Sequence, residues 1–424
     1  MTGRRIVIVN DFSVARGGAT GLAVLSAELL AAAGEEVVFL SGDDGGAPRL
    51  EEAGVRSIGL GGAPLLGRSK ASALIGGLWN ARAARFLSRW IAAEGRPGDV
   101  YHLHGWSKIL SPAVFAALRP VRASLVVHAH DFFLACPNGA FWHYGADAVC
   151  MRRPLSAACL GAACDRRSMG QKAWRVGRHM LRQAAFAFDT TGPEVLLIHH
   201  AMEPFLVRSG FASERLTVLP NPVAPATALP VAAAENSGIV FVGRLDPEKG
   251  ALAAAEAAAA AGVALTLVGE GPERAAIERA ATPGAPPPKI TGWLDRAAVT
   301  ATIRQARALV MPSRYPEPFG LVAVEALREG VPVILPRHAL LAGDIEAAHA
   351  GMAYDAGAAG ALEAALRHVA QEDAPVAKMS AAAPAAAERL ASTPEGWRDG
   401  LLAAYDRALS RAHGTAEASL VVAG

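Results

Sequence analysis

The sequence predicts an α/β protein of two domains, each a parallel β-sheet with helices on both faces. At 424 residues the chain is longer than one hydrophobic core normally supports. Short apolar runs alternate with helical runs in both halves, which is typical of doubly wound sheets. Residues 220–238 separate the halves, because they hold four prolines and end in Asn-Ser-Gly. We therefore expect one domain at 1–222 and a second at 223–395.

The first half follows this alternation from its start. A predicted strand over 5–9 leads through a Gly-Gly turn into a helical run over 19–33. The next apolar runs are too short for helices and predict buried strands over 37–40, 100–103 and 124–127.

The second half repeats the pattern after the linker. It predicts strands over 239–242, 265–268, 289–291, 308–312 and 330–335, and helices over 250–261 and 321–329. In sheets of this kind, ligands bind beyond the carboxyl ends of the strands. We therefore expect the loops at those ends to face a cleft between the two domains.

The composition limits the class of protein. Hydrophobic and charged contents of 52% and 19% exclude a disordered chain, and a net charge of +2 gives no reason to expect nucleic-acid binding. Residues 4–9 carry two arginines and too short an apolar run for a signal peptide. We find no uncharged apolar stretch long enough to span a bilayer. These observations predict a cytoplasmic protein.

One helical segment raises the question of membrane contact. Arg82, Arg85 and Arg89 recur at helical spacing beside apolar residues such as Trp79 and Phe86. The interpretation we favour is an ordinary amphipathic helix with a solvated basic face. The alternative is peripheral contact with the inner face of the membrane.

The most informative segment for function is Glu317-Pro-Phe-Gly-Leu-Val-Ala-Val-Glu325. Gly320 stands where a loop becomes a helix, and the unpaired N–H groups of a helix N-terminus suit a phosphate. Glu317 precedes that terminus and Glu325 lies about one turn inside the helix, so both carboxylates can accept hydrogen bonds from sugar hydroxyls. The segment outlines a nucleotide-sugar site; the alternative is two solvated surface carboxylates.

A second motif, Gly243-Arg-Leu-Asp-Pro-Glu-Lys-Gly250, lies between a predicted strand and helix. Arg244 offers phosphate a planar fork of donors, and Lys249 offers a point charge. A diphosphate held by this pair would be neutralised as it leaves, which takes the place of a catalytic metal. The alternative is a surface loop with two solvated cations.

The first half contributes glycines and histidines. Gly17-Gly18 can bring backbone N–H groups close to a phosphate or sugar, although the pair is not a GxGxxG fingerprint and a plain turn is the alternative. Histidines cluster near two strand ends. Among them, His130 follows the strand at 124–127, where it can hydrogen-bond a sugar hydroxyl or the transition state. We therefore count His130 as a catalytic candidate.

All four cysteines lie in one short segment, at Cys136, Cys150, Cys159 and Cys164. Four thiols can bind zinc tetrahedrally, although this spacing lacks a CxxC pair. Disulfides are not expected in a reducing cytoplasm. Two interpretations stay open: a structural zinc site or thiol staple, and ordinary buried cysteines.

Taken together, the second half resembles the retaining glycosyltransferases of family 4, which have the GT-B fold. The similarity runs through Phe241-Val-Gly-Arg-Leu245, Leu267-Val-Gly-Glu-Gly-Pro272, Met311-Pro-Ser313, Glu317 to Glu325, and Gly330-Val-Pro-Val-Ile334. The linker around 218–223 is also similar, as is a last helix over 396–412 that would return to the first domain. The run from His130 to Pro137, with the cysteines after it, resembles one subgroup of that family.

The resemblance implies two Rossmann-like domains that face a central cleft, and it assigns roles by position. Glu317 and His130 would contact the donor sugar, and Glu325 would contact the ribose. The other residues would hold the diphosphate or lie beside it: Arg244, Lys249, the backbone of Phe319, Gly320, Leu321 and Val322, and the glycine loop of Gly17 and Gly18.

These patterns predict a retaining glycosyltransferase that moves a hexosyl group from a UDP- or GDP-linked sugar to an acceptor hydroxyl. The expected acceptor is a saccharide or a lipid-linked molecule, in polysaccharide or glycolipid synthesis. No cofactor is required, and the only metal considered is the structural zinc. Two alternatives stay open: a nucleotide-sugar epimerase of the same architecture, and a non-catalytic relative that binds sugar nucleotides.

Overall fold

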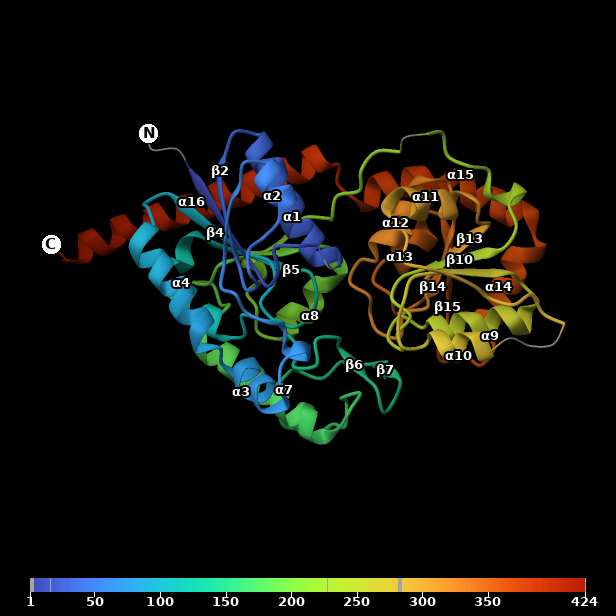
Figure 1. Ribbon diagram of the computed structural model, residues 1–424, viewed down its shortest axis with the longest axis horizontal. Coiled ribbons are helices and arrows are strands. Elements are labelled where there is room, and N and C mark those ends of the chain that lie inside the picture. The colour runs from blue at the N-terminus through green and yellow to red at the C-terminus, as the bar shows by residue number, and fades with distance from the viewer. Residues whose placement is uncertain (1–3, 16, 227, 281–283, 424) are drawn as a thin grey trace. The chain divides into compact units, whose positions relative to one another are not determined.

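The chain folds into two compact units in a computed structural model (Figure 1). The structure describes residues 4–423 except 16, 227 and 281–283, with side chains as far as 413. Each unit holds one parallel sheet with helices on both faces, so the predicted fold of two Rossmann-like α/β domains is confirmed. The first unit comprises residues 1–146, 150–219 and 394–424, and the second comprises 147–149 and 220–393.

The first unit is built on a sheet of seven parallel strands in the order β3-β2-β1-β4-β5-β8-β9. The interior strand β1 is buried on both faces, since Ile6, Val7 and Ile8 are inaccessible to solvent. The strands run β1 Arg5–Asn10, β2 Glu36–Ser41, β3 Arg56–Gly59, β4 Asp99–Leu103, β5 Leu125–Ala129, β8 Glu194–Leu197 and β9 Leu216–Val218. A separate ribbon pairs β6 Trp142–His143 with β7 Ala148–Val149.

The sequence analysis did not predict β3, β8 and β9. Each is only three or four residues long, and β3 and β9 lie at the edges of the sheet, where a strand needs no continuous apolar run.

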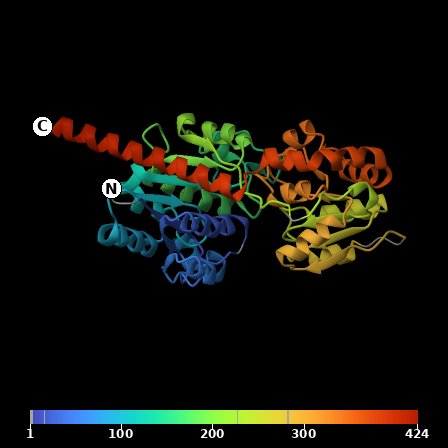
Figure 2. The same cartoon turned by 90° about the horizontal axis from the view of Figure 1, so that it is seen from above.

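The helices of the first unit cover this sheet. The last of them, α16, packs against it with Trp397, Leu401 and Tyr405, which are fully buried. Figure 2 shows α16 running along the unit. The helices are α1 Gly18–Ala32, α2 Pro48–Glu52, α3 Lys70–Leu78, α4 Ala81–Glu94, α5 Ala113–Leu118, α6 Ala157–Gly161, α7 Met169–Ala185, α8 Glu203–Arg208 and α16 Pro394–Ala423.

The second unit has a sheet of six parallel strands in the order β12-β11-β10-β13-β14-β15. Its core includes Phe241, Leu267, Val310 and Leu366. The strands run β10 Ile239–Val242, β11 Leu265–Val268, β12 Lys289–Gly292, β13 Ala308–Val310, β14 Val333–Pro336 and β15 Gly351–Tyr354. The helices are α9 Ala251–Ala261, α10 Arg274–Arg279, α11 Arg296–Arg304, α12 Leu321–Arg328, α13 Ala342–Ala347, α14 Ala361–Gln371 and α15 Asp373–Leu390.

The strand predicted from residue 330 begins three residues later, at Val333. Gly330 has a φ of 85° and closes the end of α12, and Pro332 lacks the N–H that a ladder requires. Among the described residues, no helix is both long and apolar enough to cross a bilayer.

Helix α9 is bounded by two glycines in the left-handed conformation, Gly250 at φ 72° and Gly262 at φ 70°. Their surroundings differ. A Cβ on Gly250 would lie 2.1 Å from the carbonyl oxygen of Pro312, whereas a Cβ on Gly262 would meet nothing within 4 Å. The close approach at Gly250 joins the loop after β10 to the loop after β13.

We predict that Gly250→Ala destabilises the protein by more than about 3 kcal/mol, because the clash adds to the cost of the left-handed conformation. Gly262→Ala carries only the conformational cost, about 1 kcal/mol. Urea unfolding followed by circular dichroism compares the two variants. Equal losses in free energy would contradict the steric argument.

Candidate functional site

A lysine–glutamate pair lies at the carboxyl ends of two neighbouring strands in the second unit. Lys249 is in the loop after β10, and Glu317 is in the loop after β13. The Lys249 ammonium donates to both carboxylate oxygens of Glu317, at 2.6 and 2.8 Å. The Ser313 hydroxyl donates to the same carboxylate at 2.9 Å, and the Tyr315 hydroxyl lies 3.3 Å from the ammonium. These contacts fix both side chains.

The Glu317 carboxylate is charged in this setting. Burial by itself would raise the pKa of Glu317, but the charge of Lys249 and the hydrogen bonds from Lys249, Ser313 and Tyr315 lower it below its ordinary value. The side chain therefore holds a buried negative charge that accepts hydrogen bonds.

The N-terminus of α12 lies directly after Glu317. Its N-cap is Gly320, which has a φ of 72° and offers no side chain to cap the first N–H groups of the helix. The left-handed φ explains why this position holds glycine, and a Cβ there would also lie 2.5 Å from the sulfur of Met311. Phe319 is buried, and Leu321 and Val322 begin the helix. Their N–H groups carry the positive end of the helix dipole.

Arg244 and Glu325 have partners of their own. The Arg244 side chain is 75% exposed and forms an ion pair with Asp246 at 2.8 Å. Glu325 accepts from Arg296 at 3.4 Å, and burial raises the pKa of Glu325 although Arg296 and Arg328 oppose that shift. Within the described residues we find no hydrogen bond that joins either side chain to the Lys249–Glu317 pair. The exposed guanidinium of Arg244 is available to an anionic ligand.

The first unit contains a cavity of about 90 Å³ at the carboxyl ends of β1, β4 and β5. Asn10, Asp11, Thr20, Lys108 and His130 contribute to its lining. Gly17, at φ 145°, is the N-cap of α1, and both Gly17 and Gly18 are exposed. The cavity and the uncapped end of α1 therefore belong to the same edge of the sheet.

His130 belongs to a chain of hydrogen-bonded imidazoles. Its Nε2 lies 2.9 Å from Nδ1 of His104, whose Nε2 lies 3.2 Å from Nδ1 of His102. The hydroxyl of Tyr405 on α16 lies 2.7 Å from the same His102 nitrogen. Burial lowers the pKa values of His102 and His130 to about 3, so these rings are neutral at pH 7.

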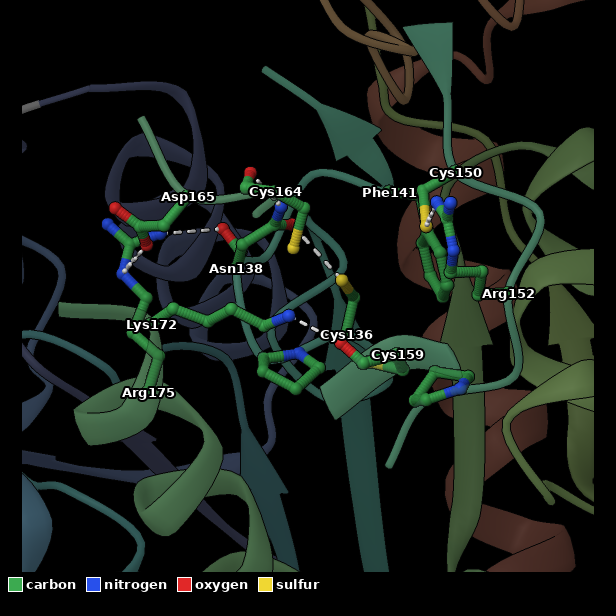
Figure 3. A pocket seen from close by; sticks show the side chains of 12 residues that line it. Cys136, Asn138, Phe141, Cys150, Arg152, Cys159, Cys164, Asp165, Lys172 and Arg175 are labelled. Atoms are coloured by element: carbon green, nitrogen blue, oxygen red, sulfur yellow. Dashed lines mark hydrogen bonds and ion pairs between the residues drawn. The ribbon is translucent and has the colours of Figure 1, made fainter. Parts of the chain in front are cut away.

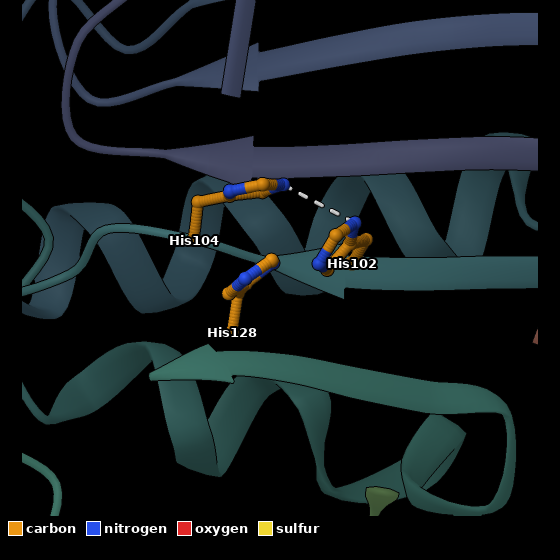
Figure 4. Close-up of side chains that lie close together, drawn as sticks. All are labelled: His102, His104 and His128. Atoms are coloured by element: carbon orange, nitrogen blue, oxygen red, sulfur yellow. Dashed lines mark hydrogen bonds between the residues drawn. The ribbon is translucent and has the colours of Figure 1, made fainter. Parts of the chain in front are cut away.

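Three imidazoles converge from the ends of β4 and β5 (Figure 4). Ligand nitrogens of His102, His104 and His128 lie within 4.8 Å of one another, so this trio could hold a metal ion. His128 also stacks on His130, with ring centroids 4.2 Å apart. The ring of His128 therefore supports the ring of His130 beside the cavity.

Sequence reasoning missed Asp11. Its buried carboxylate accepts the backbone N–H groups of Lys108, Ile109 and Leu110, at 2.7 to 2.9 Å. Burial raises the pKa of Asp11, and these three bonds oppose that shift. Asp11 therefore holds the loop after β4 against the end of β1. Its position just past the first strand was the available signal.

We predict that Lys249→Met destabilises the protein by about 2 kcal/mol at neutral pH, because it leaves the buried Glu317 charge without its partner. In the wild type, the lowered pKa of Glu317 stabilises the fold above its ordinary value of 4.5, and this contribution is lost as the pH falls through the lowered pKa. In the variant, burial dominates and raises that pKa. The deficit should therefore be largest at neutral pH and shrink on acidification.

Thermal unfolding over about pH 4 to 8 measures this deficit. The double variant Lys249→Met/Glu317→Leu should recover most of the loss, since an apolar pair needs no counter-charge. Arg244→Met should leave the melting temperature unchanged, because its side chain is exposed. A deficit that is constant with pH would contradict the electrostatic explanation.

Two protein-family models match the chain. The model described as "Glycosyl transferase 4-like domain" matches residues 17–222, and the model described as "Glycosyl transferases group 1" matches residues 232–386. Together they account for most of the sequence, and each lies within one of the two predicted domains.

Curated relatives match over part of their length. A GDP-mannose-dependent α-(1-6)-phosphatidylinositol dimannoside mannosyltransferase of Mycobacterium tuberculosis is 40% identical over 109 residues, which are 24% of this chain and 28% of that enzyme. A glycogen synthase of the same organism is 38% identical over 109 residues, or 23% of this chain and 25% of the synthase. The alignments thus span about a quarter of each relative.

Solved structures match over nearly the whole chain. A sucrose-phosphate synthase from Thermosynechococcus elongatus has a TM-score of 0.64 at 19% identity and covers 99% of this chain and 100% of its own. Anabaena HepE in complex with UDP-glucose has a TM-score of 0.62 at 16% identity, over 94% and 99% of the two chains. At these identities the likeness shows the fold. With the two family models, it leads to one conclusion: the chain belongs to the GT-B glycosyltransferases, with a 4-like domain followed by a group 1 domain.

Proposed function

We propose that the protein moves a hexosyl group from a UDP- or GDP-linked sugar to an acceptor hydroxyl, with retention of the anomeric configuration. The observation that carries the proposal is the Lys249–Glu317 pair, fixed beside the uncapped N-terminus of α12. A cation, a helix N-terminus and a buried carboxylate together offer partners to both a diphosphate and a sugar.

Each residue of the second unit has a proposed task. The Glu317 carboxylate accepts hydrogen bonds from hydroxyls of the donor sugar, and Glu325 accepts them from the ribose. Arg244, Lys249 and the N–H groups from Phe319 to Val322, including Gly320 and Leu321, hold the diphosphate. These positive groups stabilise the charge that grows on the leaving phosphate, so the reaction needs no catalytic metal.

In the first unit we assign His130 to the donor sugar and Gly17-Gly18 to the phosphate or the acceptor. His130 is neutral, and its Nδ1 is buried without a hydrogen-bond partner among the described side chains. If His104 accepts from Nε2–H of His130, then Nδ1 carries a lone pair that can accept from a sugar hydroxyl. His104 thus positions His130 by fixing its tautomer.

The names of the relatives support the donor class. The mycobacterial mannosyltransferase is named as GDP-mannose-dependent, and HepE was solved in complex with UDP and with UDP-glucose. The names also support a saccharide or lipid-linked acceptor, since that mannosyltransferase is named for a phosphatidylinositol dimannoside. We further place the chain in the subgroup whose first domain carries the His-Asp and cysteine segment.

We predict that Glu317→Gln and Arg244→Ala each lower kcat/KM by at least about 100-fold, because each removes a group that binds the reacting part of the donor. The assay measures nucleotide release from UDP- and GDP-linked glucose, galactose and mannose, with and without saccharide acceptors. Glu256→Gln, at an exposed position on α9, is the matched control and should keep full activity. Near wild-type turnover in either variant would remove the assigned role.

The same preparations separate the alternatives. Nucleotide release that depends on an acceptor supports a transferase, whereas conversion of the donor sugar without release would indicate an epimerase. A rise in melting temperature with one nucleotide identifies the base, and Glu325→Ala should abolish that rise. Binding without any turnover would indicate the non-catalytic relative.

We propose that the protein is cytoplasmic and works at the inner face of the membrane. Arg82, Arg85 and Arg89 are exposed on α4, and the nearby Ile75 and Trp79 are 69% and 37% exposed. Exposed cations beside apolar side chains suit an anionic lipid surface.

We predict that the protein sediments with phosphatidylglycerol vesicles and that the triple variant Arg82→Gln/Arg85→Gln/Arg89→Gln does so roughly 100-fold less tightly, at about 1 kcal/mol per arginine. Phosphatidylcholine vesicles provide the control. Equal binding to both kinds of vesicle, or no effect of the substitutions, would exclude this surface.

A further inference from the structure

The four cysteines surround one enclosed cavity in the insert between β5 and α7 (Figure 3). Cys136, Cys150, Cys159 and Cys164 are all buried, and none forms a disulfide. They come from four separate places: the loop before β6, the end of β7, helix α6, and the loop after α6. Side chains that far apart in sequence gather around one small space only when the insert is folded.

The insert has little regular secondary structure. Over residues 130–168, its regular structure consists of the two-residue strands β6 and β7 and the five-residue helix α6. Its buried aromatic residues, such as Phe132 and Phe141, pack against Phe205, and a metal would add a cross-link between its loops. In such segments, four cysteines commonly supply the ligands of a structural zinc.

The positive side chains around the cavity favour a negatively charged group inside it. The Lys172 ammonium is 3% exposed and donates to the backbone carbonyls of Cys159, Leu160 and Ala162. Arg152 lies 3.9 Å from the sulfur of Cys150. Arg175 is balanced by Asp165, at 3.3 Å. Lys172 and Arg152 therefore place two positive charges beside the thiols. Arg152 is exposed, but Lys172 is buried, and a buried cation is costly unless it is compensated.

We propose that the four cysteines bind one zinc ion as thiolates. A divalent ion with four thiolates carries two negative charges, which match those of Lys172 and Arg152. The cavity of about 20 Å³ has room for one atom-sized occupant, which favours a single ion over an iron–sulfur cluster. The site is structural and lies outside the sugar-transfer machinery.

Binding must draw the sulfurs together. The four thiols are not among the groups of three or more ligand atoms that lie within 4.8 Å of one another in the described residues. In a tetrahedral zinc site with bonds of 2.3 Å the sulfurs lie about 3.8 Å apart. Zinc binds cysteine as the thiolate, so loading must displace the thiol protons. Loading should therefore tighten the insert.

Elemental analysis of the full chain, purified without chelators from medium that contains zinc and iron, tests the proposal. We expect about one zinc per chain, released when a mercurial reagent modifies the thiols. Cobalt exchanged into the site should give the absorption bands of tetrahedral thiolate coordination. Alkylation of the native protein should be slow and become fast after the metal is removed. None of these readouts requires a variant that folds.

Cys159→Ser and Cys164→Ser should lose the metal. Met151→Ser is the matched control, because Met151 is a sulfur-containing residue of the same insert that is 61% exposed and does not line the cavity. Less than about a tenth of an equivalent of zinc, with no cobalt spectrum, would overturn the proposal. Zinc retained by the cysteine variants would overturn the assignment of the ligands. Iron found together with acid-labile sulfide would indicate an iron–sulfur cluster and would overturn the proposal of a single zinc ion.

Discussion

The parallel pairing of β10 with β13 determines the chemistry of the second unit. Because neighbouring parallel strands end at the same edge of a sheet, the loops that follow them must meet there. This brings Lys249 and Glu317 together across 68 residues of sequence. It also brings the backbone of Gly250 against Pro312, at a distance that admits no side chain. Two contacts thus hold the two loops together: the ion pair between Lys249 and Glu317, and the close approach of Gly250 to Pro312.

The first unit uses the same edge of its sheet for a different kind of site. The second unit presents a charged pair, whereas the first presents neutral imidazoles stacked beside a small cavity. Burial keeps His102 and His130 uncharged, so their hydrogen bonds depend on tautomers and not on protonation. Tyr405 joins this chain from α16, which links the last helix to the position of His130. Hydrogen bonds between these neutral rings fix the orientation of each ring without adding a charge.

The cysteine insert differs from both of these sites. It leaves the sheet after β5 and returns at α7 with little secondary structure, yet its four thiols are buried. The insert begins at His130, so whatever fixes the thiols also fixes the backbone next to a residue of the proposed site. A metal there would give rigidity to a segment that has little regular secondary structure.

Local patterns predicted the two α/β domains, the linker, and the residue types at the strand ends, because periodicity, prolines and glycines act over short stretches of chain. They marked Glu317, Lys249 and His130 individually. Only the tertiary structure decided the partners: Lys249 bonds to Glu317, Arg244 turns to Asp246 and solvent, Asp11 binds three backbone amides, and four imidazoles form one cluster. The order of strands in a sheet decides which loops meet, and that order depends on contacts between residues far apart in sequence.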